Sequence, residues 1–253
     1  MKEISRRSFV NQMLSSVLAF SLVKSLDNSN ALAQTVKPIT SKWLLEVEMM
    51  SKDLRGEKFK ASEWQQKIEQ LFNRIDFPDL LRTIDYTQLA KDALFPDDHD
   101  SALPLEFLQI EGLPAELAYV PFFIAMSKGR AIVPHAHHNM TSMHLVLDGK
   151  IQVRHFDRVK DEQQHLIIKP TLDKKFGRGD LSTVSDEKDN IHWFKTLSNS
   201  AFIFSVGVFE VNSDKEFSGR DFLDPLGGEK MSSGLIRARR IEEKEARKLY
   251  GKS

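Results

Sequence analysis

The chain concentrates histidine in one short stretch. Residues 134–144 have the sequence PHAHHNMTSMH and contain four of the eight histidines of the chain. His135 and His137 are separated by one residue, and alternate residues of a β-strand lie on the same face. Two imidazoles placed in this way can bind one metal ion. The stretch is therefore either a metal site or a turn in which polar residues happen to be crowded together.

A third nitrogen ligand is available further along the chain. His192 lies in the run DNIHWF, which also has the composition of a strand. Three neutral imidazoles bind one face of a divalent ion and leave other coordination positions open. The chain has no cysteine, which excludes disulfides, thiolate ligands and a cysteine nucleophile. Nitrogen ligands without sulfur suit iron, manganese, nickel, zinc or copper.

The spacing around the histidine pair resembles the first motif of the cupin superfamily. That motif has a glycine, five residues, His-x-His, three or four residues, a glutamate, six residues and a second glycine. Gly129 and Gly149 fit the two ends of this frame, and His135 and His137 fit its middle. Ser142 occupies the place of the glutamate.

The second cupin motif is matched less completely. It begins at Gly179 and Asp180, and His192 falls in the place of its histidine, two residues later than usual. The proline and the glycine of that motif are absent. The resemblance covers approximately residues 115–210.

This resemblance implies a double-stranded β-helix, or jelly roll, that holds one divalent transition metal through His135, His137 and His192. Without the carboxylate, the site is similar to that of the three-histidine cupins, which include iron-dependent thiol dioxygenases and related dioxygenases. We therefore expect iron in preference to manganese, copper, zinc or nickel. The alternative is a cupin scaffold that has lost its metal site, and Ser142 is the evidence for it.

Two further residues of the stretch are predicted to take part in the chemistry. His144 lies two residues after Ser142, so both side chains project to the same face of a strand. We expect Ser142 or His144 to hydrogen-bond to the species bound at the metal, and His144 is alternatively a fourth ligand. His138 follows His137 directly and is expected to point away.

The predicted function is that of an oxidoreductase of the dioxygenase type acting on a small organic substrate. The missing carboxylate makes the site more cationic and favours an anionic or chelating substrate. The alternative from another class is a non-catalytic periplasmic cupin that binds metal or a small ligand. A third reading is an isomerase or hydrolase that uses the metal as a Lewis acid.

A mainly β barrel is expected to position these residues. From about residue 105, short runs rich in β-branched and aromatic residues alternate with glycine, aspartate or lysine clusters. Their spacing is typical of an antiparallel sandwich or barrel. We place the cupin barrel at residues 105–215, and a C-terminal tail with a short charged helix at residues 216–253.

Residues 34–104 are predicted to form an N-terminal α-helical extension, because their apolar positions recur at helical spacing. Ser62 and Gln65 have the spacing of a capping box at the start of one helix. Another helix is expected between Leu80 and Leu94. A polar linker with one histidine, His99, follows.

Residues 1–33 are predicted to be an export signal peptide. Arg6 and Arg7 follow Ser5 and precede an apolar run that is too short to span a bilayer, and small residues before Gln34 suit a cleavage site. The run SRRSF resembles the twin-arginine export signal of bacteria. We therefore expect a periplasmic protein without a stable membrane anchor after signal removal.

The charge composition argues against large charged partners. The chain has 36 Lys and Arg and 36 Asp and Glu, so its formal net charge is zero. We expect a small-molecule substrate or ligand and no nucleic acid, and a homodimer is a further option because cupins often pair through their sheets. Arg154 either faces inward to bind a carboxylate or, as is commoner for arginine, lies on the surface.

Overall fold

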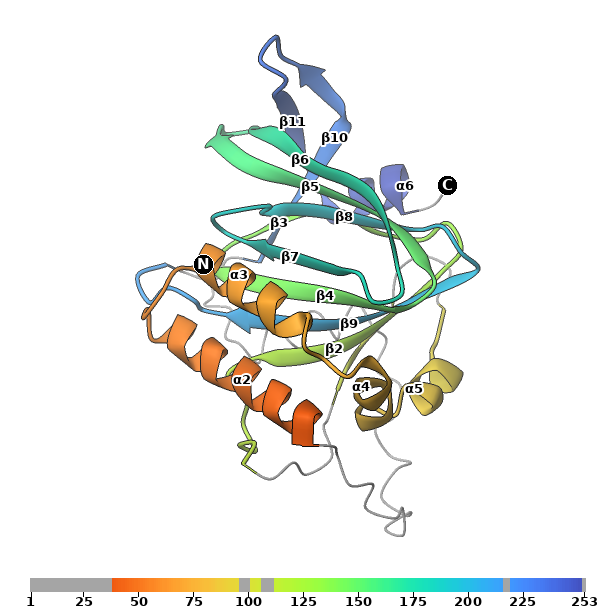
Figure 1. The fold of residues 1–253 in the computed structure, drawn as a ribbon. Coiled ribbons are helices and arrows are strands. Elements are labelled where there is room, and N and C mark those ends of the chain that lie inside the picture. The colour runs from red at the N-terminus through yellow and green to blue at the C-terminus, as the bar shows by residue number, and fades with distance from the viewer. Residues whose placement is uncertain (1–37, 96–100, 106–111, 216–218, 252–253) are drawn as a thin grey trace.

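The computed structural model describes residues 38–95, 101–105, 112–215 and 219–251 (Figure 1). The predicted signal peptide and His99 lie outside the described residues. Within the described ranges, no helix is both long enough and apolar enough to cross a membrane.

Two antiparallel sheets form the body of the fold. The first has the strand order β1-β2-β9-β4-β7, and the second, β10-β11-β6-β5-β8-β3, closes into a barrel. Four strands of each sheet, β2-β9-β4-β7 and β3-β8-β5-β6, have the arrangement of a double-sheet jelly roll, because the chain passes repeatedly from one sheet to the other. The predicted mainly β jelly roll is therefore confirmed. The strand bounds are β1 Ser101–Pro104, β2 Val120–Ser127, β3 Ala131–His137, β4 Met140–Asp148, β5 Lys150–Asp161, β6 His165–Gly177, β7 Leu181–Ser185, β8 Ile191–Thr196, β9 Ser200–Phe209, β10 Arg220–Lys230 and β11 Ile236–Ile241.

Strand β4 is buried on both faces. Met140 and Val146 pack in a core between the two sheets, together with residues of β5 and β8. Met143 and Leu145, at the alternate positions, pack in a different core that includes the N-terminal helices. Because successive side chains of a strand point to opposite faces, β4 separates the interior of the jelly roll from a helical layer.

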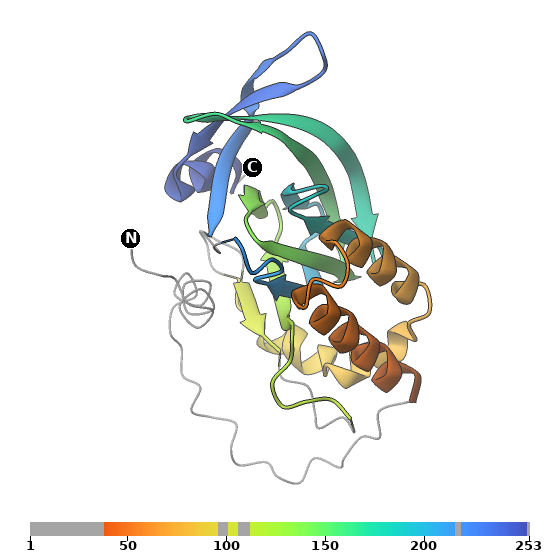
Figure 2. The same ribbon diagram turned by 90° about the vertical axis from the view of Figure 1, so that its left-hand side faces the viewer.

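The helical layer covers the outer face of the first sheet. Helices α2 (Pro38–Arg55) and α3 (Ala61–Phe72) lie along this face (Figures 1 and 2). Trp64 of α3 is fully buried, and the ring of Trp43 in α2 lies with its centroid 6.2 Å from that of Phe204 in β9. The predicted helical extension is confirmed, and its packing partner is the outer surface of β4, β7 and β9.

The predicted capping box at Ser62 and Gln65 is wrong. The N-cap of α3 is Lys60, which makes no side-chain cap. The Ser62 hydroxyl instead donates to Glu187 at 2.5 Å, and Gln65 accepts a hydrogen bond of 2.7 Å from the Ser185 hydroxyl. Both side chains reach across to the chain around β7, so the demands of packing outweigh local capping here.

The single helix predicted between residues 80 and 94 is two short helices, α4 (Phe77–Thr83) and α5 (Tyr86–Asp92). Asp85 lies between them with a positive φ of 49° and caps α5 by accepting a bond from the backbone N–H of Gln88. Aspartate tolerates this left-handed conformation better than most residues, and it ends the helical path.

The C-terminal segment contains two strands that the sequence analysis does not predict. The hairpin β10–β11 joins β3 to β6 and so closes the second sheet (Figure 2). Leu223 and Ala238 of the hairpin are buried against Ala136 and Ile191, on the face of the second sheet that points away from the first. The predicted C-terminal helix is confirmed as α6 (Glu243–Tyr250).

The second glycine of the cupin-like frame has a structural reason. Gly149 alone connects β4 to β5, and its φ is +85°. A Cβ at this position would collide with the backbone oxygen of Ser200. Glycine is the residue that adopts this conformation without a steric penalty.

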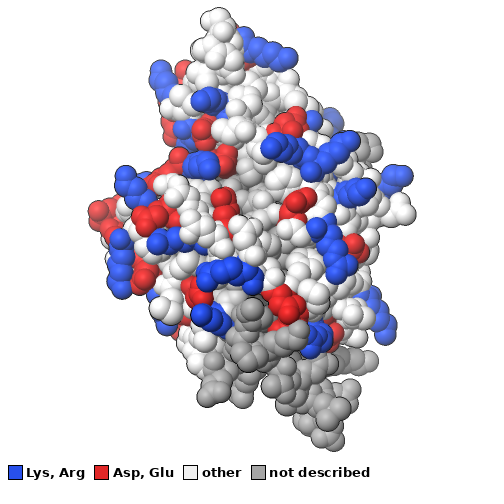
Figure 3. All heavy atoms as spheres, in the orientation of Figure 1, with Lys and Arg blue, Asp and Glu red and all other residues white. Residues whose placement is uncertain are grey.

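On the face seen in Figure 3, basic and acidic side chains are interspersed. This surface agrees with the balanced charge of the chain.

Candidate metal centre

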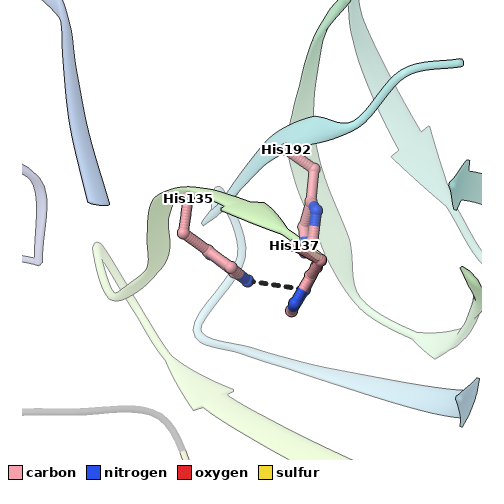
Figure 4. A group of neighbouring side chains, drawn as sticks. All are labelled: His135, His137 and His192. Atoms are coloured by element: carbon pink, nitrogen blue, oxygen red, sulfur yellow. Dashed lines mark hydrogen bonds between the residues drawn. The ribbon is translucent and has the colours of Figure 1, made fainter. Parts of the chain in front are cut away.

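The three predicted ligands lie together between the sheets. His135 and His137 come from β3 and His192 from the neighbouring strand β8, where it is the register partner of His135. The three side chains point toward one another (Figure 4), and each offers a ring nitrogen that lies within 4.8 Å of the others. All three residues are buried.

A β-bulge turns the histidine pair inward. Ile132 faces the core between the sheets, whereas Val133 packs on the opposite face against residues of α6. The register of β3 against β8 shifts between Ile132 and His135. The extra residue reverses the alternation, so His135 lies on the interior face although it is two residues after Val133. Pro134 lies within this shift, where a residue without an N–H is tolerated.

The hydrogen bonds of His135 leave one nitrogen for a metal. Its Nδ1 lies 2.8 Å from the backbone oxygen of Val133. A carbonyl oxygen only accepts, so Nδ1 donates and Nε2 keeps its lone pair. That Nε2 lies 3.0 Å from Nε2 of His137. Two nitrogens this close can both contact one ion at a metal–nitrogen distance of about 2.0–2.1 Å.

Two buried nitrogens of the group have no protein partner. Within the described residues, Nδ1 of His137 and Nδ1 of His192 make no hydrogen bond. Buried polar atoms are nearly always paired, and an unpaired one costs about 1–3 kcal/mol. The residues fit a metal ion because Nε2 of His135 and Nε2 of His137 face each other 3.0 Å apart and a nitrogen of His192 completes the group of nitrogens within 4.8 Å of one another.

The three imidazoles are also in the protonation state that a metal requires. Burial lowers the pKa of His135, His137 and His192 well below the ordinary value, and neighbouring cationic groups lower it further. The rings are therefore neutral near pH 7. Neutral imidazole is the form that coordinates a metal.

Ser142 and His144 face this group from the first sheet. Nε2 of His144 lies 3.0 Å from the Ser142 hydroxyl, and Nδ1 lies 2.9 Å from the hydroxyl of Ser205 in β9. The His144 ring centroid is 5.3 Å from that of His192. His144 does not belong to the group of nitrogens that lie within 4.8 Å of one another, and both of its own nitrogens contact serine hydroxyls. Its chemical role stays a prediction.

Sequence reasoning missed a fifth buried histidine, His155 of β5. It pairs in register with His192, and its Nε2 lies 2.8 Å from the hydroxyl of Ser182 in β7. Burial lowers the pKa of His155 to about 4, although nearby Asp189 opposes the shift. The alternation of Ile151, Val153 and His155 was a usable signal, because the two aliphatic residues face the same core.

The remaining candidates lie outside the centre. His138 points away as predicted, and its Nε2 is 2.8 Å from a carboxylate oxygen of Asp221. Arg154 lies on the outer face, where it donates to Asp173 at 3.0 Å and covers the Trp193 ring. The side-chain amide of Asn190 donates to the backbone oxygen of His137 and so fixes the backbone of one ligand.

No family model matches the sequence, and no curated protein matches it. Several solved structures are similar in fold. Oxalate oxidase is 13% identical, with 46% of this chain and 53% of that chain covered and a TM-score of 0.34. Procruciferin, an 11S globulin from Brassica napus, is 12% identical, with 51% and 28% covered and a TM-score of 0.35. A cupin superfamily protein from Desulfitobacterium hafniense DCB-2 is 11% identical, with 48% and 87% covered and a TM-score of 0.31.

The chain thus spans about half of the oxalate oxidase chain or less than a third of the procruciferin chain. At these identities and TM-scores the likenesses say nothing of the reaction. The assignment of the jelly roll depends on the strand order and not on these neighbours.

We expect the metal-free protein to lose stability as the pH falls below about 6.5, the ordinary pKa of histidine. Burial lowers the pKa of His144 to about 3, so between these two values the unfolded chain binds a proton that the folded chain does not. Within that window the free energy of unfolding falls by about 1.4 kcal/mol for each pH unit of acidification and for each such histidine. Urea unfolding in a chelator between pH 7 and pH 5 measures this slope.

The variant His144→Gln removes one titrating group, and its slope should be shallower by roughly one histidine. Ser142→Ala alters the same cluster without removing a titrating group and should keep the original slope. Parallel curves for His144→Gln and the unaltered protein would contradict the assignment of His144 as a neutral buried ring.

Proposed function

We propose that this protein holds one divalent metal ion through His135, His137 and His192 and is an oxidoreductase of the dioxygenase type acting on a small organic substrate. The observation that carries the proposal is the convergence of three neutral, buried imidazoles, two of which have a nitrogen with no protein partner. Iron is the metal we favour over manganese, copper, zinc and nickel. When bound, divalent iron would supply the redox chemistry that couples the oxidation of an organic substrate to dioxygen.

The residues of the first sheet complete the proposed site. His144 is held in place at both nitrogens, by Ser142 on its own strand and by Ser205 on β9. Both ring nitrogens are then occupied, so the group offered to the substrate is the Ser142 hydroxyl, which His144 orients and which has hydrogen-bonding capacity beyond this one contact. The ring of Phe194, 5.0 Å from His144 and 5.2 Å from His192 between centroids, adds an apolar wall that excludes water.

We expect protein expressed at full length to contain about one transition-metal ion per chain. His135→Ala should lose most of this metal, because Nε2 of His135 is a ligand atom. His138→Ala is the matched control, since this adjacent histidine bonds Asp221 outside the centre, and it should keep its metal. Metal analysis of the purified proteins measures both.

A low metal content that His135→Ala leaves unchanged would refute the metal centre. In that case the jelly roll would be a scaffold without a metal.

We expect the iron-loaded protein to consume dioxygen with at least one member of a panel of thiols, catechols and keto acids. His144→Gln should keep its iron and lower the rate by roughly 10- to 100-fold, the usual effect of removing a group that orients the species at a metal. An oxygen electrode, with product analysis, provides the measurement. Stoichiometric iron without oxygen uptake on any substrate would instead favour a protein that binds metal or a small ligand.

We further propose that the protein is exported to the periplasm by a twin-arginine route, on the support of residues 1–33 alone. In a Gram-negative host the mature chain should appear in the periplasmic fraction and begin at Gln34. The double substitution Arg6→Lys and Arg7→Lys should retain it in the cytoplasm, whereas Lys2→Arg, outside the pair, should not. Unchanged partition of the double variant would refute this route.

A further inference from the structure

Asn190 lies between the two strands that carry the candidate ligands. It directly precedes β8 and is two residues before His192. Ala136 and Ile191 are register partners, and both pack on the face of the second sheet that points away from the first. Because successive side chains of a strand alternate between faces, His137 and Asn190, one step further along each strand, project to the interior face.

The side-chain amide of Asn190 has bonded donors and an unbonded oxygen. Its Nδ2 lies 2.9 Å from the backbone oxygen of His137 and 3.3 Å from the backbone oxygen of Ser185. Asn190 is only 3% exposed, and within the part of the chain that the structure describes its Oδ1 accepts no hydrogen bond. Buried polar atoms are nearly always paired, so this oxygen is suited to a donor that the centre itself supplies.

The helical layer fixes the position of this amide. The Ser185 hydroxyl donates at 2.7 Å to Oε1 of Gln65, a buried residue of α3. The backbone oxygen of the same serine accepts from Asn190. A path of hydrogen bonds therefore runs from α3 through Ser185 and Asn190 to the backbone of His137. Because the amide is held at two points, its oxygen keeps a fixed direction.

The hydrogen bonds of the histidine pair fix the tautomer of His137. Nδ1 of His135 donates to the backbone oxygen of Val133, so Nε2 of His135 is an acceptor. Nε2 of His137 lies 3.0 Å from that acceptor and must donate to it, which leaves Nδ1 of His137 without a proton. In this state Nδ1 of His137 and Oδ1 of Asn190 are both acceptors, and two acceptors do not bond each other.

We infer that Asn190 is a positioning residue of the metal centre, and that its Oδ1 accepts a hydrogen bond from Nδ1–H of His137 once Nε2 of that ring binds a metal ion. The inference rests on the proposed function, because it concerns the same three-histidine group. A neutral imidazole has one proton, so a ring that gives its Nε2 lone pair to a metal carries the proton on Nδ1. An acceptor for that proton orients the ring and increases its basicity. Asn190 thereby sets the affinity of the centre for its metal.

The first test measures the affinity of the full-length protein for zinc(II) by competition with a chelator. Asn190→Ala should weaken zinc binding by roughly 10- to 100-fold, the usual effect of removing the hydrogen-bond partner of a ligand. Asn190→Asp keeps acceptor oxygens and loses the amide donors, and it should recover most of the affinity. Thr196→Val is the matched control, because Thr196 is another buried residue of β8 whose side-chain oxygen has no partner, and it should bind zinc like the unaltered protein.

The second test is nitrogen NMR of the imidazoles, which a general loss of stability does not imitate. Zinc should move the proton of His137 from Nε2 to Nδ1. That Nδ1–H should exchange slowly with water in the unaltered protein and in Asn190→Asp, and faster in Asn190→Ala. Nδ1–H of His135, which is bonded to Val133, is the internal reference and should exchange slowly in all three proteins.

Three results would overturn the inference. The first is equal zinc affinity in Asn190→Ala and Thr196→Val. The second is an equal loss of affinity in Asn190→Ala and Asn190→Asp, which would assign the effect to the amide donors. The third is rapid exchange of Nδ1–H of His137 in the zinc-loaded unaltered protein, a result that needs no variant and decides the question if Asn190→Ala fails to fold.

Zinc stoichiometry separates this inference from the proposed function. An unaltered protein that binds no zinc would refute the metal centre, and the inference with it, because no ligand is then left to position. Zinc bound equally well by Asn190→Ala and the unaltered protein would refute the role of Asn190 alone.

Discussion

The structure depends on the burial of five imidazoles between two apolar sheets. His135, His137, His144, His155 and His192 are all almost completely removed from solvent. Burial keeps such rings neutral, and each neutral ring still has a donor and an acceptor to satisfy. Serine hydroxyls satisfy both nitrogens of His144 and one nitrogen of His155, and a backbone carbonyl satisfies one nitrogen of His135. Among the buried imidazoles of the described residues, the nitrogens without a hydrogen-bond partner are Nδ1 of His137 and Nδ1 of His192, and both belong to the group that a metal would occupy.

Strand register and one bulge decide where this polar cluster forms. Without the shift between Ile132 and His135, the histidine pair would lie on the face of Val133, under α6, and no ligand group would exist. The pairing of β8 with both β3 and β5 then brings His192 next to His135 on one side and to His155 on the other. A one-residue slip of β8 would turn His192 to the opposite face.

The additions to the jelly roll support the centre from outside. The helical layer buries the outer face of β4 and β9, the strands that carry His144 and Ser205. The β10–β11 hairpin pairs with β3 and brings Arg220 opposite His137. On the other face of the same hairpin, Asp221 bonds His138 and Arg240, which ties the loop after the ligand pair to the closed second sheet. Both additions therefore pack against or pair with strands that carry the histidine cluster, without supplying any of the three candidate ligands.

The local features could be predicted from the order of the residues. Alternation placed His135 with His137 and Ser142 with His144, the cupin-like frame identified His192, and composition separated helices from strands. Which faces of the strands and helices meet became known only from the folded structure. The period of a strand shows that two residues share a face but not which strand lies opposite. The sequence therefore did not predict that His155 and Ser205 lie close to the histidine group, and the inward or outward position of Arg154 was left open. Ser62 and Gln65 illustrate the same limit, because hydrogen bonds to Glu187 and Ser185, more than 100 residues away in the chain, replaced the local cap. Register, bulges and long-range hydrogen bonds depend on the packing of the whole chain, and for that reason only the folded structure fixed them.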